Sequence, residues 1–336
     1  MPCPYNGFYN EMTILHDLAA GVRAGHIRAL AKAITLVESR NLDHSLAATT
    51  LLDELLPDTG RAIRIGISGV PGAGKSTFIE AFGLHLTGLG RKVAVLAVDP
   101  SSQRSGGSIL GDKTRMEELS RDGRAFIRPS PAGDTLGGVA RKTRETMLIC
   151  EAAGFDVIII ETVGVGQSEI TVASMVDFFL LLQLPNAGDE LQGIKRGVME
   201  IADAIVVNKA EGDNRPRAEL ARQQCVNALH MLAPKSAHWQ VPVLLCSALQ
   251  REGVAEVWQT VEGFRTAMQT SGEYDEKRAL QNSDWMWTLL MDDLKETFLR
   301  HPKVEALLPQ LQASVATGVT TPGAAARRLL EVFRRG

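Results

Sequence analysis

Cysteines and long apolar runs are both scarce in this sequence, and each absence narrows the class of protein. The four cysteines in 336 residues lie far apart and form no C-x-x-C pair, so neither a disulfide framework nor a clustered metal site is predicted. The longest apolar runs, at 157–160 and 178–182, have the length of strands and are too short to cross a bilayer. The first twelve residues lack the basic segment and apolar run of a secretory signal. We therefore expect a cytoplasmic protein without a membrane partner.

An excess of charge of one sign is missing as well. The net charge is −3, with 36 Lys and Arg residues against 39 Asp and Glu residues, and this balance does not indicate a nucleic-acid-binding surface. Aromatic residues make up only 5% of the chain, whereas hydrophobic residues reach 45%. A core of aliphatic side chains is typical of α/β proteins, and the length allows one such domain with additions.

One stretch carries a specific chemical signal. Gly69-Val-Pro-Gly-Ala-Gly-Lys-Ser76 matches the pattern G-x-x-x-x-G-K-S/T of a phosphate-binding loop (P-loop), between a strand-like and a helix-like segment. Glycines let the backbone turn its N–H groups toward a phosphate, and a helix N-terminus favours negative charge. We expect the Lys75 ammonium to reach the β- and γ-phosphates and the Ser76 hydroxyl to ligate Mg²⁺. The predicted nucleotide-binding residues here are Gly69, Pro71, Gly72, Ala73, Gly74, Lys75, Ser76 and Thr77.

The surrounding pattern predicts an α/β fold. Apolar strand-like segments alternate with helical patterns and occupy residues 63–68, 92–98, 125–128, 156–161, 177–183, 203–208 and 241–246. Such alternation predicts a mostly parallel central sheet flanked by helices, as in P-loop NTPases. Helical spacing dominates residues 13–56, 276–300, 303–315 and 322–334. We predict an N-terminal helical extension (1–60), a P-loop domain (61–270) and a C-terminal helical arm (271–336).

Two later loops indicate which base is bound. Asn208-Lys-Ala-Glu211 directly follows an apolar strand and resembles the N-K-x-D base-recognition motif of GTPases, with Glu211 in place of Asp. Its carboxylate offers the same paired acceptors to guanine on a longer stem. Ser247, Ala248 and Leu249 follow the next strand and resemble the loop whose backbone N–H meets guanine O6. The alternative for residues 208–211, including Lys209, is a polar loop that caps a helix.

Candidate metal-binding and catalytic groups end other strands. Glu161 and Gly164 close an apolar strand and resemble the D-x-x-G switch, with Glu161 holding Mg²⁺ through water and the Gly164 N–H meeting the γ-phosphate. Residues 165–169 are expected to form a flexible polar loop in which Gln167 is better interpreted as a surface residue than as a water-positioning one. Asp99 ends the strand at 92–98 and is expected either in the Mg²⁺ shell or as a base toward water, the alternative being a turn cap. Asp112 is a metal candidate or a solvated loop acid.

Taken together, these motifs resemble the MeaB/ArgK family, P-loop GTPases that act as chaperones for adenosylcobalamin-dependent methylmalonyl-CoA mutase. The resemblance rests on GVPGAGKST, VDPSS, GDKTRM, ETVGVGQSE and NKAEGD, and it covers nearly the whole chain. It implies GTP/GDP and Mg²⁺ as cofactors, and GTP hydrolysis that is slow alone and faster with the mutase. It also implies gating of cofactor loading, protection of the mutase from inactivation, and a homodimer. By resemblance, phosphate, Mg²⁺ and catalytic duties fall to Lys75, Ser76, Asp99, Asp112, Glu161 and Gly164, and base binding to Asn208, Lys209, Glu211 and Ala248.

Two further segments are candidates for partner contacts. Residues 185–195 carry glycines and charges after a buried strand, and the family resemblance marks this loop as a third switch, with Asp189, Glu190 and Lys195 as contact candidates. The alternative is an ordinary loop that leads into a helix. The apolar group from Trp285 to Phe298 is expected to cover either the P-loop domain or a second subunit.

Three other functions remain open at this level. A P-loop kinase would transfer the γ-phosphoryl group to a small acceptor, although it has no use for an N-K-x-D/E motif. A nickel-insertion GTPase would need clustered Cys and His ligands, and the seven histidines are scattered. A non-catalytic nucleotide-dependent scaffold would bind nucleotide without turnover.

Overall fold

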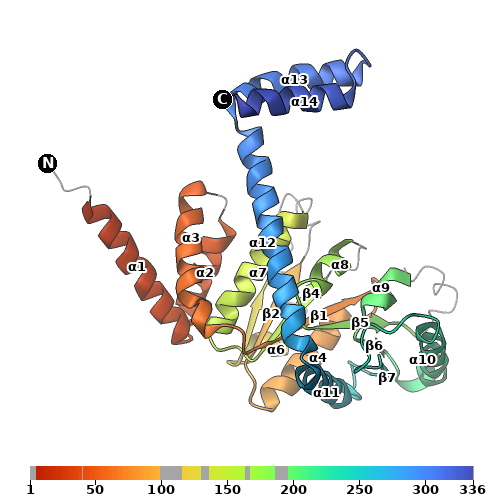
Figure 1. Cartoon of the computed structure of the whole chain (residues 1–336). Coiled ribbons are helices and arrows are strands. Elements are labelled where there is room, and N and C mark those ends of the chain that lie inside the picture. The colour runs from red at the N-terminus through yellow and green to blue at the C-terminus, as the bar shows by residue number, and fades with distance from the viewer. Residues whose placement is uncertain are drawn as a thin grey trace. The chain divides into compact units, whose positions relative to one another are not determined.

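The described residues form an all-parallel sheet of seven strands, in the order β3-β2-β4-β1-β5-β6-β7 (Figure 1). The computed structural model describes residues 5–39, 41–98, 116–129, 136–162, 167–185 and 196–335. The strands are β1 (Ile63–Gly69), β2 (Val93–Val98), β3 (Ala125–Arg128), β4 (Val157–Thr162), β5 (Phe178–Gln183), β6 (Ala204–Val207) and β7 (Val243–Leu245). All seven predicted strands and the predicted fold class are confirmed, with strand ends shifted by only one or two residues.

Strand β1, which leads into the P-loop, lies in the middle of the sheet. It pairs in parallel with β4 on one side and β5 on the other. In this register Ile67 lies opposite Glu161. Since the carboxyl ends of parallel strands share one edge, the loops that follow β1, β4, β5 and β6 all leave the sheet on the same side.

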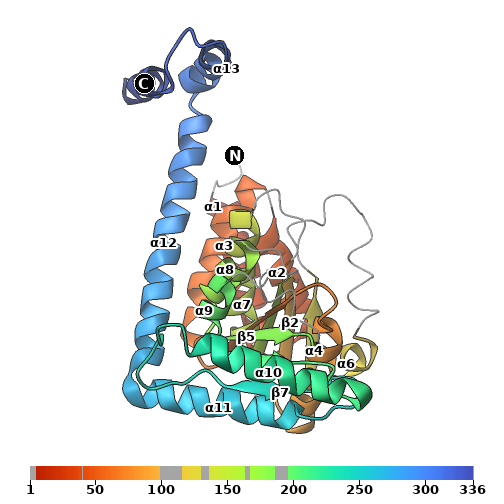
Figure 2. The ribbon, with the colours of Figure 1, turned by 90° about the vertical axis from the view of Figure 1, so that its right-hand side faces the viewer.

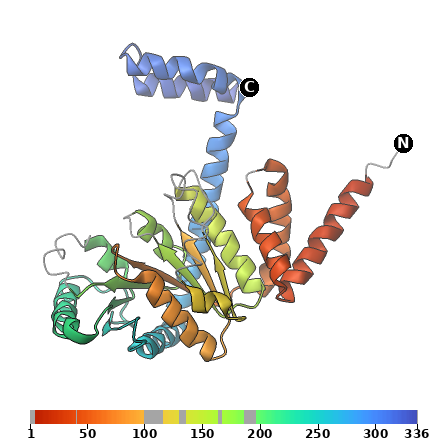
Figure 3. The same ribbon diagram turned by 180° about the vertical axis from the view of Figure 1, so that it is seen from behind.

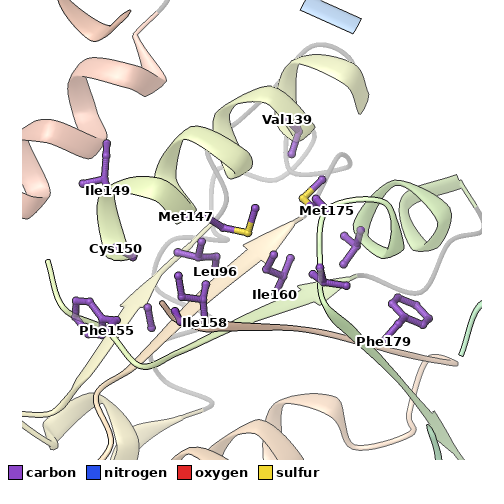
Figure 4. Close-up of a cluster of buried hydrophobic side chains, with 14 of the residues drawn as sticks. Leu96, Val139, Met147, Ile149, Cys150, Phe155, Ile158, Ile160, Met175 and Phe179 are labelled. Atoms are coloured by element: carbon purple, nitrogen blue, oxygen red, sulfur yellow. The ribbon is translucent and has the colours of Figure 1, made fainter. Parts of the chain in front are cut away.

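Side chains alternate between the two faces of the sheet, and each face has its own helical cover. On one face, Ile63, Ile65 and Ile67 pack with α4 (Lys75–Gly88), α6 (Glu117–Arg121) and α11 (Val254–Ser271). On the other face, buried side chains such as Ile158, Ile160 and Phe179 pack against further helices (Figure 4). These helices are α7 (Leu136–Ala152), α8 (Gln167–Ala173), α9 (Arg196–Ile201) and α10 (Arg215–Leu229). Figure 2 shows α10 beside the edge strand β7.

The N-terminal helices are packed onto this second face. Helices α1 (Tyr5–Arg23), α2 (Ile27–Glu38) and α3 (Leu42–Leu55) lie beside α7 (Figure 3). Leu30, Ile34 and Leu51 are fully buried in the same cluster as the sheet residues. Arg23 donates to the carboxylates of Asp58 and Glu54. The helices predicted at 13–56 are thus confirmed, and they belong to one compact unit that extends to Lys277.

Residues Arg278–Gly336 form a second compact unit. It contains most of α12 (Glu273–Leu299) together with α13 (Pro302–Ala316) and α14 (Pro322–Arg334). The last two helices share a small core of Val304, Leu311, Ala325 and Leu329. The three predicted C-terminal helices are confirmed, while the predicted domain boundaries at residues 60 and 270 stay predictions. Within the described ranges, no helix is long and apolar enough to span a membrane.

Candidate nucleotide-binding site

The P-loop joins β1 to α4, and two of its glycines are required by geometry. Gly72 and Gly74 have φ angles of +81° and +83°, a left-handed conformation that residues with a Cβ rarely adopt. A Cβ on Gly74 would also lie 2.8 Å from Asn208 Nδ2. Ala73 is buried, whereas Pro71 and Thr77 are exposed. The absence of a side chain at Gly74 therefore lets the Asn208 side chain lie close to the backbone of the loop.

The Lys75 side chain turns back over this loop. Its Nζ donates to the Gly69 carbonyl oxygen at 2.7 Å and lies 3.4 Å from that of Val70. Burial lowers the pKa of Lys75, while the negative charges of Glu161 and Glu169 act in the opposite direction. The arrangement keeps an ammonium group inside the loop where a phosphate would need a counter-ion.

The two predicted metal ligands in the described structure are brought together from different elements. Ser76 Oγ, in the first turn of α4, donates to Glu161 Oε1 near the end of β4 at 3.2 Å. A hydroxyl oxygen and a carboxylate oxygen are ligands that Mg²⁺ accepts, so this pair fits a magnesium ion beside the phosphates. Asp99 and Asp112 lie outside the described residues. Within those residues, no group of three or more His, Cys, Asp or Glu side chains gathers as a metal cluster.

Asn208 connects three loops at the carboxyl edge of the sheet. Its Nδ2 donates to the Ala73 carbonyl oxygen at 2.8 Å, and its Oδ1 accepts from the Ala248 N–H at 3.1 Å. The side chain is 1% exposed. The Ala210 N–H donates to the Cys246 carbonyl oxygen at 3.1 Å and joins the second and third loops again. One buried amide thus holds the P-loop, the loop at 208–211 and the loop at 246–249 together.

The carboxylate of Glu211 fits recognition of a guanine edge. Its Oε2 is buried and has no hydrogen-bond partner among the residues that the structure describes, which is costly unless a ligand supplies a donor. Guanine presents two such donors, N1–H and N2–H. The neighbouring Lys209 is exposed and adopts a left-handed φ of 60°. A guanine base could therefore supply the hydrogen-bond donor that Glu211 Oε2 lacks, and the base-binding role of Glu211 stays a prediction.

The third loop is held by its own hydrogen bonds. Ser247 Oγ accepts from the Gln250 N–H at 3.1 Å, and the backbones of Ser247 and Glu252 pair in both directions. Ser247 is buried, whereas Leu249 is 75% exposed. The Ala248 N–H, predicted to meet guanine O6, donates to Asn208 in this structure. Direct contact of residues 247–249 with a base stays a prediction.

The prediction of a flexible loop was wrong for residues 167–169. Residues 167–169 were expected in a flexible polar loop, but Gln167–Ala173 is helix α8, and Ser168 and Glu169 are buried. Glu169 Oε1 accepts from Ser68 Oγ at 3.0 Å, directly behind the P-loop. Ser168 and Glu169 are polar residue types, so the sequence did not indicate that they are buried. They are buried because α8 packs on the sheet. A polar residue at the end of a buried strand, as Ser68 is, was the available signal.

Several predicted residues fall outside the described structure. Gly164, Asp189, Glu190 and Lys195 belong to this group, as Asp99 and Asp112 do. Their proposed roles in phosphate sensing and partner contact stay predictions. The hydrogen bonds of the structure connect Lys75, Ser76, Glu161, Asn208 and Ala248 to the P-loop or to one another.

Known proteins resemble this chain over most of its length. The family model for the methylmalonyl-CoA mutase-associated GTPase MeaB matches residues 30–303. A protein of Caulobacter vibrioides whose name describes it as a GTPase is 57% identical over 318 residues, covering 95% of this chain and 96% of that protein. GTPase ArgK of Escherichia coli is 47% identical over 325 residues, with 97% and 98% covered. The Mus musculus protein named methylmalonic aciduria type A homolog, mitochondrial, is 47% identical over 334 residues, with 96% and 80% covered.

A solved structure agrees at the level of the fold. It is described as the crystal structure of LAO/AO transport system kinase, and it matches with a TM-score of 0.76 and 41% identity, covering 96% of this chain and 98% of its own. The family model spans the P-loop, the Ser76–Glu161 contact and the Asn208 junction described above. The resemblance inferred from the motifs is confirmed, and the chain belongs to the MeaB family of methylmalonyl-CoA mutase-associated GTPases.

Proposed function

We propose that this chain is a Mg²⁺-dependent GTPase that acts as a chaperone for adenosylcobalamin-dependent methylmalonyl-CoA mutase, gating cofactor loading and protecting the mutase from inactivation. The observation that carries the nucleotide part is the Asn208 junction together with Glu211, whose buried Oε2 has no hydrogen-bond partner among the described residues. A loop that only capped a helix would not need a buried acceptor without a donor. A guanine base supplies the donors that this site lacks.

The described residues divide the chemistry among them. Lys75 would exchange its bonds with the Gly69 and Val70 carbonyl oxygens for phosphate oxygens, because a charge-assisted bond to an anion is stronger. Ser76 and Glu161 would hold Mg²⁺, which would neutralise charge on the β- and γ-phosphates. Asn208 would keep the base loops against the P-loop, so that base recognition and phosphate binding share one rigid frame. Asp99 and Gly164 complete the proposed catalytic set.

The partner assignment rests on family membership. The family is named for association with methylmalonyl-CoA mutase, and the mouse relative carries a name that refers to methylmalonic aciduria. We propose that this chain contacts the mutase through residues 185–195, with Asp189, Glu190 and Lys195 as contact groups. We also propose that nucleotide hydrolysis is slow alone and faster when the mutase is bound. The cytoplasmic location stays a prediction.

The proposal includes a homodimer formed with a second copy of this chain. Apolar side chains on α12 are exposed at positions 280, 287, 290, 291 and 294. Spacings of three, four and seven residues put these side chains on one stripe of a helix. Phe298, predicted to share this face, packs instead against Phe333 with ring centroids 5.2 Å apart. We propose that the exposed stripe at positions 280–294, which includes Trp287, packs against the same stripe of a second copy.

The first test is GTP turnover by the purified protein, measured alone and with the apo and holo forms of methylmalonyl-CoA mutase. We expect slow release of phosphate from GTP that rises when the mutase is added, and little release from ATP. Turnover that does not change with the mutase would contradict the chaperone role while leaving the GTPase role intact. A preference for ATP would contradict the base assignment.

A second candidate is suggested by the description of the related crystal structure as a transport system kinase. A kinase would produce a phosphorylated acceptor instead of free phosphate. Following the γ-phosphoryl group of labelled GTP therefore separates the two reactions. We expect all of the label in inorganic phosphate.

A further inference from the structure

A buried polar network behind the P-loop has no role in the function described so far. Thr162 Oγ1 donates to Ser68 Oγ at 2.9 Å, and Ser68 Oγ donates to Glu169 Oε1 at 3.0 Å. Thr162 and Ser68 are fully buried, and Glu169 is 6% exposed. Each hydroxyl has one proton and an ionised carboxylate only accepts, so both bonds point toward Glu169. We call these three residues the Glu169 network.

The network lies one residue away from both halves of the phosphate and metal site. Ser68 precedes Gly69, whose carbonyl oxygen accepts from Lys75 Nζ. Thr162 follows Glu161, which accepts from Ser76. Strand alternation places Ser68 and Thr162 on the face covered by α8, opposite the face that carries α4. The network therefore supports the site from behind without occupying it.

The choice of a carboxylate needs a physical reason. Burying a charged group costs free energy unless hydrogen bonds and opposite charges offset it. Glutamine at position 169 would still accept the hydrogen bond from Ser68 and would avoid most of that cost. Burial lowers the pKa of Lys75, and the negative charges of Glu161 and Glu169 raise it. Glu169 is connected to this ammonium group through Ser68, the neighbour of the Gly69 carbonyl that Lys75 Nζ contacts.

We propose that Glu169 is a positioning residue of the GTPase site. Through Ser68 it holds the end of β1 from which the P-loop begins, and its charge keeps the Lys75 ammonium directed into that loop. It acts through these two residues and does not touch the nucleotide. The inference rests on the proposed function, because it takes the P-loop to be the GTP site.

The test begins with Glu169→Gln, which keeps the hydrogen-bond acceptor and removes the charge. We expect kcat for GTP to fall about 10- to 100-fold, the usual effect of losing a group that orients a functional residue. The KM for GTP should stay the same or fall, because a negative charge near the triphosphate is removed. A residue with only a structural role would instead raise KM and lower the melting temperature. A wild-type kcat would overturn the proposal.

Glu145→Gln is the matched control. Glu145 is also a buried glutamate, on α7, and it accepts at 3.1 Å from Nε of Arg141, a residue outside the Glu169 network. This variant should keep the wild-type kcat and KM. If both variants lose activity to the same extent, loss of a buried charge in general explains the effect, and the proposal fails.

Ser68→Ala tests whether Glu169 acts through the network. Adding it to Glu169→Gln forms a double-mutant cycle on kcat. We expect the double variant to be no slower than the slower single variant, since both changes break one pathway. Additive losses would show that Glu169 acts without Ser68 and would overturn the inference.

A binding measurement separates failure of this inference from failure of the proposed function. If the wild-type protein binds GTP without hydrolysing it, the GTPase proposal fails. The ratio of affinities for a non-hydrolysable GTP analogue and for GDP then tests Glu169 on its own. A ratio that changes in Glu169→Gln and not in Glu145→Gln supports the positioning role, and an unchanged ratio contradicts it.

Discussion

At the scale of single residues, Asn208 and Glu211 have different proposed roles in base recognition. Asn208 is satisfied on both sides of its amide, by the Ala73 carbonyl oxygen and the Ala248 N–H. It is therefore a structural connector whose loss would separate the loops. Glu211 has a buried oxygen that finds no partner in the described part of the chain, so its contribution to the free energy is expected only when a ligand is bound.

Glu211→Ala should therefore weaken guanine preference while leaving the protein folded. We expect the affinity for GTP to fall about 10- to 100-fold, the value of hydrogen bonds to a charged acceptor, and the affinity for ATP to change little. Isothermal titration of both nucleotides measures the ratio. Glu219→Ala, at an exposed glutamate on α10 that pairs with Arg222, is the control. An unchanged ratio of GTP to ATP affinity in Glu211→Ala would overturn the base-recognition role.

At the scale of elements, the approach of α8 to the sheet depends on a glycine in β1. A Cβ on Gly66 would lie 2.9 Å from both Phe179 Cδ2 and Val172 Cγ1 and 3.1 Å from Val176 Cγ2. A side chain at position 66 would thus collide with Phe179 of β5, with α8 and with the turn after it. The same close approach brings Glu169 to Ser68, so packing and site geometry are linked at this position.

Gly66→Ala should move α8 away from the sheet. We expect the free energy of unfolding to fall by about 1–3 kcal/mol, as for other overpacked cores, and GTP turnover to fall with it. Chemical denaturation with a matched turnover assay measures both. Gly263→Ala on α11 is the control, because nothing lies within 4 Å of its added Cβ, and alanine stabilises a helix by about 0.5–1 kcal/mol relative to glycine. Equal stability of the two variants would contradict the packing argument.

At the scale of the whole molecule, the exposed stripe on α12 makes self-association testable. Trp287 is 56% exposed and Leu294 is 52% exposed, a large apolar area for a helix in water. If a second copy covers this stripe, a charge placed within it would have to be buried in the dimer, at a cost of several kcal/mol.

Leu294→Glu should convert the dimer to a monomer at micromolar concentration. Size-exclusion chromatography with light scattering measures the mass directly. Asn282→Glu introduces the same side chain at an exposed position about half a turn away from the stripe, and it should remain dimeric. A wild-type monomer, or equal masses for the two variants, would rule out this interface.

Much of the fold was readable without coordinates because its signals are local. Strand periodicity marked all seven strands, since a buried parallel strand needs a short run of apolar residues. Glycine spacing marked the P-loop because glycine adopts the positive φ of residues 72 and 74 without steric cost, and other residues rarely do. The same local reasoning misread the start of α8, because two polar residues there are buried by a distant strand.

Residue type and spacing along the chain are enough to predict the seven strands, the P-loop and the family. Which side chains meet depends on how the chain is packed. The Ser76–Glu161 pair, the Asn208 junction and the Glu169 network each join residues separated by 40 to 135 positions. Such contacts follow from strand order and register, which place β1 between β4 and β5. Burial of a polar group is likewise a property of the packed sheet and helices, and no residue carries it alone.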